Sequence, residues 1–307
     1  MNWRREIIAG LTTFSAMAYI LVVNPAMLSI TGMDRDALLF ATALAAAIGS
    51  ILMGALTRYP IALAPGMGLN AFFTFTICEQ MEIPWQGALA MVFWTGVLFL
   101  ILTFTPLRER LVRAIPLSLK IAIQGGIGLF VVVIGLKNLG LLTDPAPTWI
   151  ALRFADPATY SFAALILAII GCVLAFFLVK REIAGALLIA IALVTVAGLF
   201  VAEGSKPITA RPEALFGLPP DPSPLLFQLD WFYPFQHWES VWLAMLTLVF
   251  VDLFDSLGTL IGTSRQAGLT DETGALPRIK QALTADAAAT SSGACLGTST
   301  TTSYIES

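Results

Sequence analysis

The stretch from Leu243 to Thr263 is the feature that most constrains what this chain can fold into. It is apolar and long enough to cross a bilayer as a helix, yet it carries Asp252 and Asp255 near its middle. Residues three apart share one face of a helix. Because a charged side chain at bilayer depth costs at least a few kcal/mol, we expect this helix to turn both carboxylates towards protein, water or a ligand.

The rest of the chain is as apolar as this stretch. Hydrophobic residues make up 57% of the sequence and charged residues only 12%, whereas a soluble domain carries about a quarter charged residues. The apolar runs are about twenty residues long, which predicts an all-α polytopic membrane protein and argues against a β-barrel. Ten spans are predicted, at residues 7–29, 37–57, 62–78, 87–105, 116–136, 161–179, 183–201, 241–263, 281–296 and from 297 to the end.

The basic residues predict how the chain is oriented. With the N-terminus inside, 12 lysines and arginines fall on the inner side and 5 on the outer side, which accounts for all 17. This bias favours a multi-pass protein of the plasma (inner) membrane with a cytoplasmic N-terminus. The first apolar run is too long for a signal peptide and is expected to be retained as a span. The proline-rich residues 202–240 are predicted to form an outer connecting loop between residues 1–201 and 241–307.

Two of the predicted spans are abnormal. The third contains Pro65, Gly66 and Gly68, which break a helix, followed by Asn70. The tenth is rich in hydroxyl side chains and ends near Glu306, so we expect it to be an extended segment that lines a cavity. Interrupted segments at matching places in two halves indicate an inverted-repeat transporter.

Four acids are candidates for function, each with a structural alternative. Asp255 is predicted to be functional, although it could cap a neighbouring backbone. Glu306 is also favoured for function, the alternative being a solvated terminal glutamate. For Asp286, a helix–helix hydrogen bond and a proton relay are equally supported, and Asp252 is expected to be a structural or relay acid.

These residue types fit one kind of ligand. Two carboxylates with nearby amides and hydroxyls, such as that of Thr259, suit a flat, neutral molecule with N–H donors. Phe72, Phe73 and Phe75 could supply a stacking face, although for any single one of them packing in the core or against lipid is the favoured interpretation. A carboxylate in a low-dielectric site holds a proton more readily than one in water, which offers a way to couple transport to protons.

Other classes of protein are disfavoured. Three cysteines and one histidine, His237, match no metal motif or catalytic triad, so no metal or cofactor is expected. Asp252 and Asp255 on one helix face cannot form the opposed pair of an aspartyl protease, so the chain is not expected to be an enzyme. An anion carrier would need a cation or bare helix N-termini at its site. The charges are spread among loops and indicate no binding of nucleic acid.

Several motifs resemble a known family. The chain contains GLTTFSAMAYILVVNPAML, APGMGLNAFF, FVDLFDSLGTLIG and LTADAAATSSGACLGTSTTTSYIES, in spans one, three, eight and nine to ten. Together they resemble the nucleobase:cation symporter 2 family, and within it the adenine/guanine/hypoxanthine permease branch. The resemblance implies an importer of purine nucleobases that works by proton symport. A uracil or xanthine carrier and an anion carrier of the same fold remain alternatives.

The resemblance also implies an architecture and a site. Family members have fourteen spans in two inverted repeats, with a core domain that moves like an elevator against a gate domain and with dimers in the membrane. Spans one to four and eight to ten of this chain would belong to the core, and spans five to seven to the gate. The base would bind between the third and tenth segments, with Asp255 and Glu306 as its acids and Asp286 as the acid of span nine. Gly68 and Asn70 match the third-span motif. The chain stops inside the tenth segment, so we expect it to be a C-terminally truncated piece.

Overall fold

The computed structural model describes residues 3–105, 142–146, 149–152, 162–181, 183, 185–203, 206–209, 219–271, 276–305 and 307, with scattered helical positions between 122 and 136. The chain divides into two compact units. The first unit comprises Met1–Tyr19 and Gly128–Leu218, and the second comprises Ile20–Ile127 and Pro219–Ser307. Each is described by itself below.

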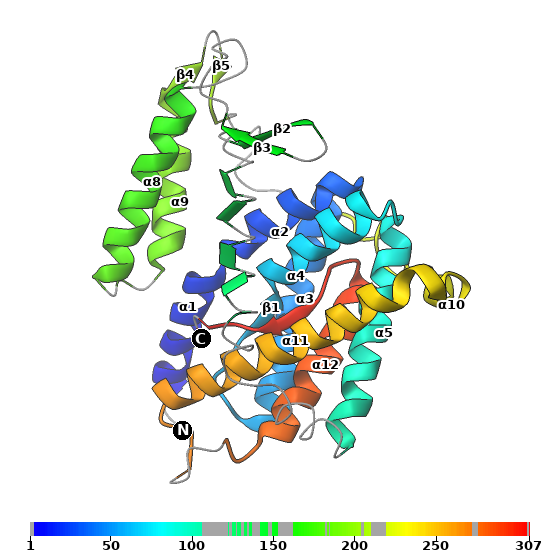
Figure 1. Ribbon diagram of the computed structural model, residues 1–307. Coiled ribbons are helices and arrows are strands. Elements are labelled where there is room, and N and C mark those ends of the chain that lie inside the picture. Colours follow the sequence, from blue (N-terminus) through cyan, green and yellow to red (C-terminus); the bar gives the residue numbers. More distant parts are fainter. Residues whose placement is uncertain are drawn as a thin grey trace. The chain divides into compact units, whose positions relative to one another are not determined.

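The first unit is built from apolar helices. It contains α1 (Trp3–Met17), α8 (Phe162–Lys180) and α9 (Ala186–Phe200), with two short hairpins formed by β2 (Leu142–Ala146) with β3 (Trp149–Leu152) and β4 (Ala202–Glu203) with β5 (Lys206–Pro207). Helices α8 and α9 lie side by side (Figure 1). Gly171 permits this contact, because a Cβ there would lie 2.7 Å from Val194. Small residues at helix contacts are typical of membrane proteins.

The second unit is a helical bundle around an alanine-rich helix. Its longer helices are α2 (Ile20–Leu28), α3 (Arg35–Thr57), α5 (Trp85–Phe104), α11 (Trp238–Gln266) and α12 (Ile279–Leu296), with the short η1 (Ser29–Thr31) and α10 (Tyr233–Gln236) between them. Helix α12 packs against α5 and α3 (Figure 1). Two glycines allow the close approach. A Cβ at Gly96 of α5 would lie 3.0 Å from the carbonyl of Ala287, and one at Gly49 of α3 would lie 3.2 Å from the Cβ of Ala289.

The two segments predicted to be interrupted are both irregular, and they pair with each other. The first runs as β1 (Leu63–Pro65), then α4 (Met67–Ala71), then the π-helix η2 (Phe72–Gln80), and the second contains β6 (Thr301–Ser303). The strands are antiparallel, with Leu63 opposite Ser303 and Pro65 opposite Thr301. In Figure 1 the red arrow of β6 runs beside β1. The predicted helix break and the predicted extended segment are therefore both confirmed.

Both strands are buried, and their backbone groups are paired through the strand partner and its neighbours. The N–H of Gly66 donates to the carbonyl of Thr300 over 2.9 Å. The hydroxyl of Tyr304 donates to the carbonyl of Pro65 over 2.8 Å. Non-helical backbone at membrane depth is stable only when its polar groups find such partners inside the protein.

In the part of the chain that the structure describes, five helices are long and apolar enough to cross a membrane: Glu6–Thr31, Arg35–Thr57, Trp85–Phe104, Phe162–Lys180 and Trp238–Arg265. They match five of the predicted spans, and the chain is a polytopic membrane protein. The predicted span at 183–201 appears as the shorter helix α9, and that at 281–296 as the small-residue helix α12. The predicted span at 116–136 lies largely outside the described residues.

The first predicted span, residues 7–29, corresponds to the candidate membrane span Glu6–Thr31. Within it, Ala18 and Tyr19 form a turn that separates α1 from α2. Neither residue disfavours a helix, so the sequence carries no sign of the break. It coincides with the boundary between the two compact units.

Candidate functional site

The strand pair β1–β6 meets helix α11 at three residues, which we call the strand-pair site: Gly66, Asp255 and Thr302. The hydroxyl of Thr302 donates to Oδ2 of Asp255 over 3.4 Å, a long and therefore weak hydrogen bond. A Cβ on Gly66 would lie 3.0 Å from that hydroxyl oxygen and 3.9 Å from Oδ2 of Asp255. Glycine thus keeps the space between the first strand and the carboxylate open.

Asp255 is the accessible member of the two aspartates on α11. Its side chain is partly exposed, and so are Gly258 and Thr259, which lie one turn further along the same helix. Gly68, in the first turn of α4, is also partly exposed. A carboxylate with one weak partner and some exposed surface is able to accept hydrogen bonds from a ligand.

Asp252 has a different environment, although it shares a helix face with Asp255. It has no exposed surface, and neither of its carboxylate oxygens has a hydrogen-bond partner among the described residues. Thr290 lies beside it, but the single hydroxyl hydrogen of Thr290 is donated to the carbonyl of Thr301 over 3.0 Å. Asp286 and Asp255 are its acidic neighbours within the bundle, so these three acids form one cluster.

Asp286 is fully buried and fully bonded. One oxygen, Oδ1, accepts both the backbone N–H and the hydroxyl of Ser303, over 3.0 and 2.9 Å, and the other accepts the hydroxyl of Ser256. These bonds tie α12 to strand β6 and to α11. Asp286 therefore holds the second interrupted segment in place, whatever further role it has.

Asn70 lies at the centre of a buried polar network. Its Nδ2 donates to Oδ1 of Asn24 over 2.6 Å, and its Oδ1 accepts the hydroxyl of Ser299. Asn24 in turn donates to the hydroxyl oxygens of Thr42, over 2.7 Å, and Thr298, over 2.9 Å. Asn24 was not among the predicted site residues, and its signal in the sequence is that it is a lone amide in the apolar run of residues 20–28.

The remaining predicted residues lie elsewhere. Phe73 has no exposed surface and packs in a core cluster that also contains Leu69, Leu89 and Met91. Its ring therefore faces no open space in this structure. Phe72 and Phe75 are partly exposed. Glu306 lies outside the described residues. His237 stacks on Tyr233 with ring centroids 4.2 Å apart, near the start of α11. Within the described residues no group of three or more His, Cys, Asp or Glu side chains could hold a metal ion.

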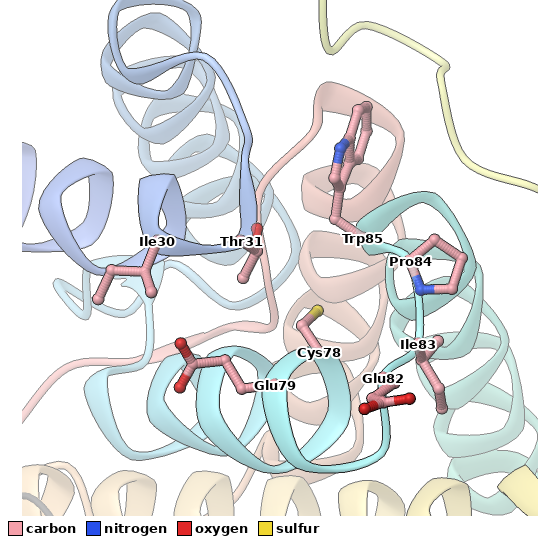
Figure 2. A pocket seen from close by; sticks show the side chains of 8 residues that line it. All are labelled: Ile30, Thr31, Cys78, Glu79, Glu82, Ile83, Pro84 and Trp85. Carbon is pink, nitrogen blue, oxygen red and sulfur yellow. The ribbon is translucent and has the colours of Figure 1, made fainter.

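An open pocket of about 460 Å³ lies away from the strand-pair site. Figure 2 shows Ile30 and Thr31 on one side, Cys78 and Glu79 from the end of η2, and Glu82 to Trp85 from the turn that leads into α5. None of these lining residues belongs to the strand pair or to α11. The pocket therefore adds nothing to the carboxylate site.

A membrane protein that pairs two interrupted segments beside buried carboxylates has the features of a polytopic transporter. Comparison with known families agrees. Residues 4–307 match the model described as "Permease family" (Xan_ur_permease), and the chain belongs to that family. The resemblance found in the sequence is thus confirmed, and so is the prediction that the chain is a transport protein and not an enzyme.

Several curated relatives match over essentially the whole chain. A putative permease of Methanocaldococcus jannaschii is 44% identical, over 100% of this chain and 67% of the relative. The guanine/hypoxanthine permease PbuG of Bacillus subtilis is 41% identical, over 100% and 69%. The adenine permease AdeP of Escherichia coli is 38% identical, over 99% and 65%. The chain therefore spans about two thirds of the length of these relatives.

Proposed function

We propose that this chain forms the larger part of a transporter that imports purine nucleobases (adenine, guanine or hypoxanthine) across the plasma (inner) membrane by proton symport. The observation that carries the proposal is the pairing of β1 with β6 beside the partly exposed carboxylate of Asp255. The names of the relatives, which include adenine and guanine/hypoxanthine permeases, support purines as the substrate class.

The proposed architecture is an inverted repeat of seven plus seven spans. Residues 1–201 would form the first repeat, 202–240 the outer connection, and 241–307 the start of the second repeat. The antiparallel pairing of the two interrupted segments supports this, because paired broken segments at the repeat interface are typical of such transporters. On this proposal the N-terminus is cytoplasmic, the chain is a fragment of a longer protein, and the complete transporter forms homodimers.

The base is proposed to bind at the strand-pair site. A carboxylate accepts two N–H donors from one edge of a heterocycle, and Asp255 has the free lone pairs for this. Thr259, one turn further along α11, and Gly68, in the first turn of α4, also have partly exposed surface and are proposed to line the site. Glu306 is proposed as the second acid. Asn70 and Phe73 have no exposed surface here, so they are proposed to support the site from behind or to reach the base when the segment opens.

Proton coupling is proposed to use the acids behind the site. Asp252 and Asp286 are both fully buried, and the described residues around them supply hydroxyl and backbone donors but no cationic side chain. Two adjacent buried carboxylates cannot both be charged without a large cost, so one of them holds a proton most easily. Asp252 has the free oxygens for this role, whereas those of Asp286 are occupied.

The test is uptake of radiolabelled hypoxanthine by the complete transporter in cells that lack purine transport. Unlabelled adenine, guanine, uracil, xanthine and sulfate serve as competitors, with and without a protonophore. Competition by adenine or guanine alone that is lost with the protonophore is the expected result. Competition by uracil, xanthine or sulfate would move the chain to another branch, and uptake that resists the protonophore would contradict proton symport.

A further inference from the structure

The neighbours of Asn24 determine the orientation of its buried amide, that is, which of them Nδ2 faces and which Oδ1 faces. The hydroxyl of Thr42 donates its hydrogen to the carbonyl of Leu38 over 2.6 Å, so the oxygen of Thr42 can only accept. The group of Asn24 that faces this oxygen must therefore be Nδ2, at 2.7 Å. Rotating the amide by half a turn would place Oδ1 against two hydroxyl oxygens, those of Thr42 and Thr298.

The orientation of the Asn24 amide determines that of the Asn70 amide. Because Nδ2 of Asn24 faces Thr42, its Oδ1 faces Asn70 and accepts from Nδ2 of Asn70 over 2.6 Å. Oδ1 of Asn70 is then turned towards Ser299, whose hydroxyl donates to it. In the series Ser299, Asn70, Asn24 and Thr42, each side chain therefore donates a hydrogen bond to the next one. Such chains polarise one another and specify a single arrangement.

The series joins parts of the chain that are far apart in sequence. Asn24 lies on α2, Thr42 on α3 and Asn70 on α4, while Thr298 and Ser299 lie in the segment that connects α12 to β6. All five side chains have no exposed surface. A buried amide without partners costs several kcal/mol in apolar surroundings, so this cluster is stable only while all its parts stay together.

We propose that Asn24 is a positioning residue of the strand-pair site. By fixing the direction of the Asn70 amide, it holds α4 and the segment before β6 in the relative placement that brings Thr302 to Asp255. The inference rests on the proposed function, since it assigns this placement to the binding of a nucleobase. Asn24 itself touches no residue of the strand-pair site in the described hydrogen bonds.

The first arm of the test needs no substrate. Asn24→Leu, Ser299→Ala and the double variant are purified as the complete transporter, and their thermal midpoints are compared. Each single variant is expected to lower the midpoint by about 2–4 °C. The shifts are expected to be non-additive, because both residues act through Asn70. Additive shifts would overturn the link between them.

The second arm separates positioning from packing. Asn24→Leu is expected to raise the KM for the transported base about three- to tenfold, the equivalent of one hydrogen bond. Adding Thr42→Val makes the facing pair apolar but leaves Asn70 without its partner, so the KM is expected to stay raised and the midpoint to recover only in part. Thr103→Val is the control, since among the described residues that buried hydroxyl bonds to its own helix, at the carbonyl of Phe99.

The outcomes are distinct. If the double variant recovers both the midpoint and the KM, or if Asn24→Leu has the wild-type KM, Asn24 serves packing alone and the inference is wrong. If the wild-type transporter takes up no nucleobase, the proposed function fails, whereas the stability arm still decides whether Asn24 and Ser299 are linked.

Discussion

Ser303 donates both its backbone N–H and its hydroxyl to the same oxygen, Oδ1 of Asp286, over 3.0 and 2.9 Å. With Ser256 on the other oxygen, one buried carboxylate holds strand β6 against two helices. The second interrupted segment is therefore held by this acid of α12 in addition to its pairing with β1.

Replacing this acid should destabilise the protein. Asp286→Ala leaves three buried donors unpaired, and each unpaired donor costs about 1–3 kcal/mol before any relaxation. We expect a clear fall in the thermal midpoint of the purified transporter. Asp36→Ala, at an exposed aspartate in the first turn of α3, is the matched control and should change the midpoint little. Equal shifts in the two variants would show that the bonds to Asp286 do not hold β6.

Neutral isosteres of the two proposed binding acids should abolish uptake. Asp255→Asn and Glu306→Gln keep the shape but lose the charge-assisted bonds to the base, about 1.5–3 kcal/mol each or roughly ten- to hundredfold in affinity. The variants should still reach the membrane, as judged by immunoblotting of membrane fractions. Glu239→Gln, at an exposed acid in the first turn of α11, should transport normally. Normal uptake by either test variant would refute that residue's assignment.

Asn70→Ala should weaken uptake or change the order in which bases compete. The substitution removes the link between Asn24 and Ser299, so the strand-pair site loses support even if Asn70 never touches the base. The measurement is inhibition of labelled hypoxanthine uptake by a panel of purines. An unchanged ranking with unchanged affinities would count against any contribution of the third segment.

Two glycines should respond to alanine in opposite directions. At Gly96, a Cβ would lie 2.9 Å from the backbone nitrogen of Ser291 and 3.0 Å from the carbonyl of Ala287, so Gly96→Ala must push α5 and α12 apart. At Gly54, a Cβ would meet nothing within 4 Å, and Gly54→Ala should gain up to about 1 kcal/mol from helix propensity. Thermal midpoints decide the matter, and a fall in both variants would contradict this account of the packing.

The irregular third and tenth segments were predictable from the sequence, whereas their pairing was not. Pro65 followed directly by Gly66 disfavours a continuous helix, and the hydroxyl-rich residues 298–304 are too polar to face lipid. The register that sets Leu63 opposite Ser303 depends on helices α3, α11 and α12, which bring the strands together from opposite ends of the chain. No local pattern encodes such a contact.

The environments of the two aspartates on α11 show the same limit. Their spacing correctly placed Asp252 and Asp255 on one side of a helix, but it could not tell that Asp252 is fully buried while Asp255 keeps exposed surface. How far each side chain is buried depends on which other helices pack against its turn of α11. Asn24 was missed for a related reason, since a single amide in an apolar run reveals its importance only when Asn70 and Thr298 are seen beside it.

The π-helix η2 makes the first interrupted segment shorter than it would be if the same residues formed an α-helix. In a π-helix each N–H bonds five residues back instead of four, so the turns are wider and the same number of residues spans a shorter distance than in an α-helix. Rewinding Phe72–Gln80 as an α-helix would lengthen the segment between β1 and α5. Each backbone N–H would then bond to the carbonyl four residues back instead of five. A shift of β1 along the membrane normal could therefore be absorbed within η2, leaving α5 and its contact with α12 in place.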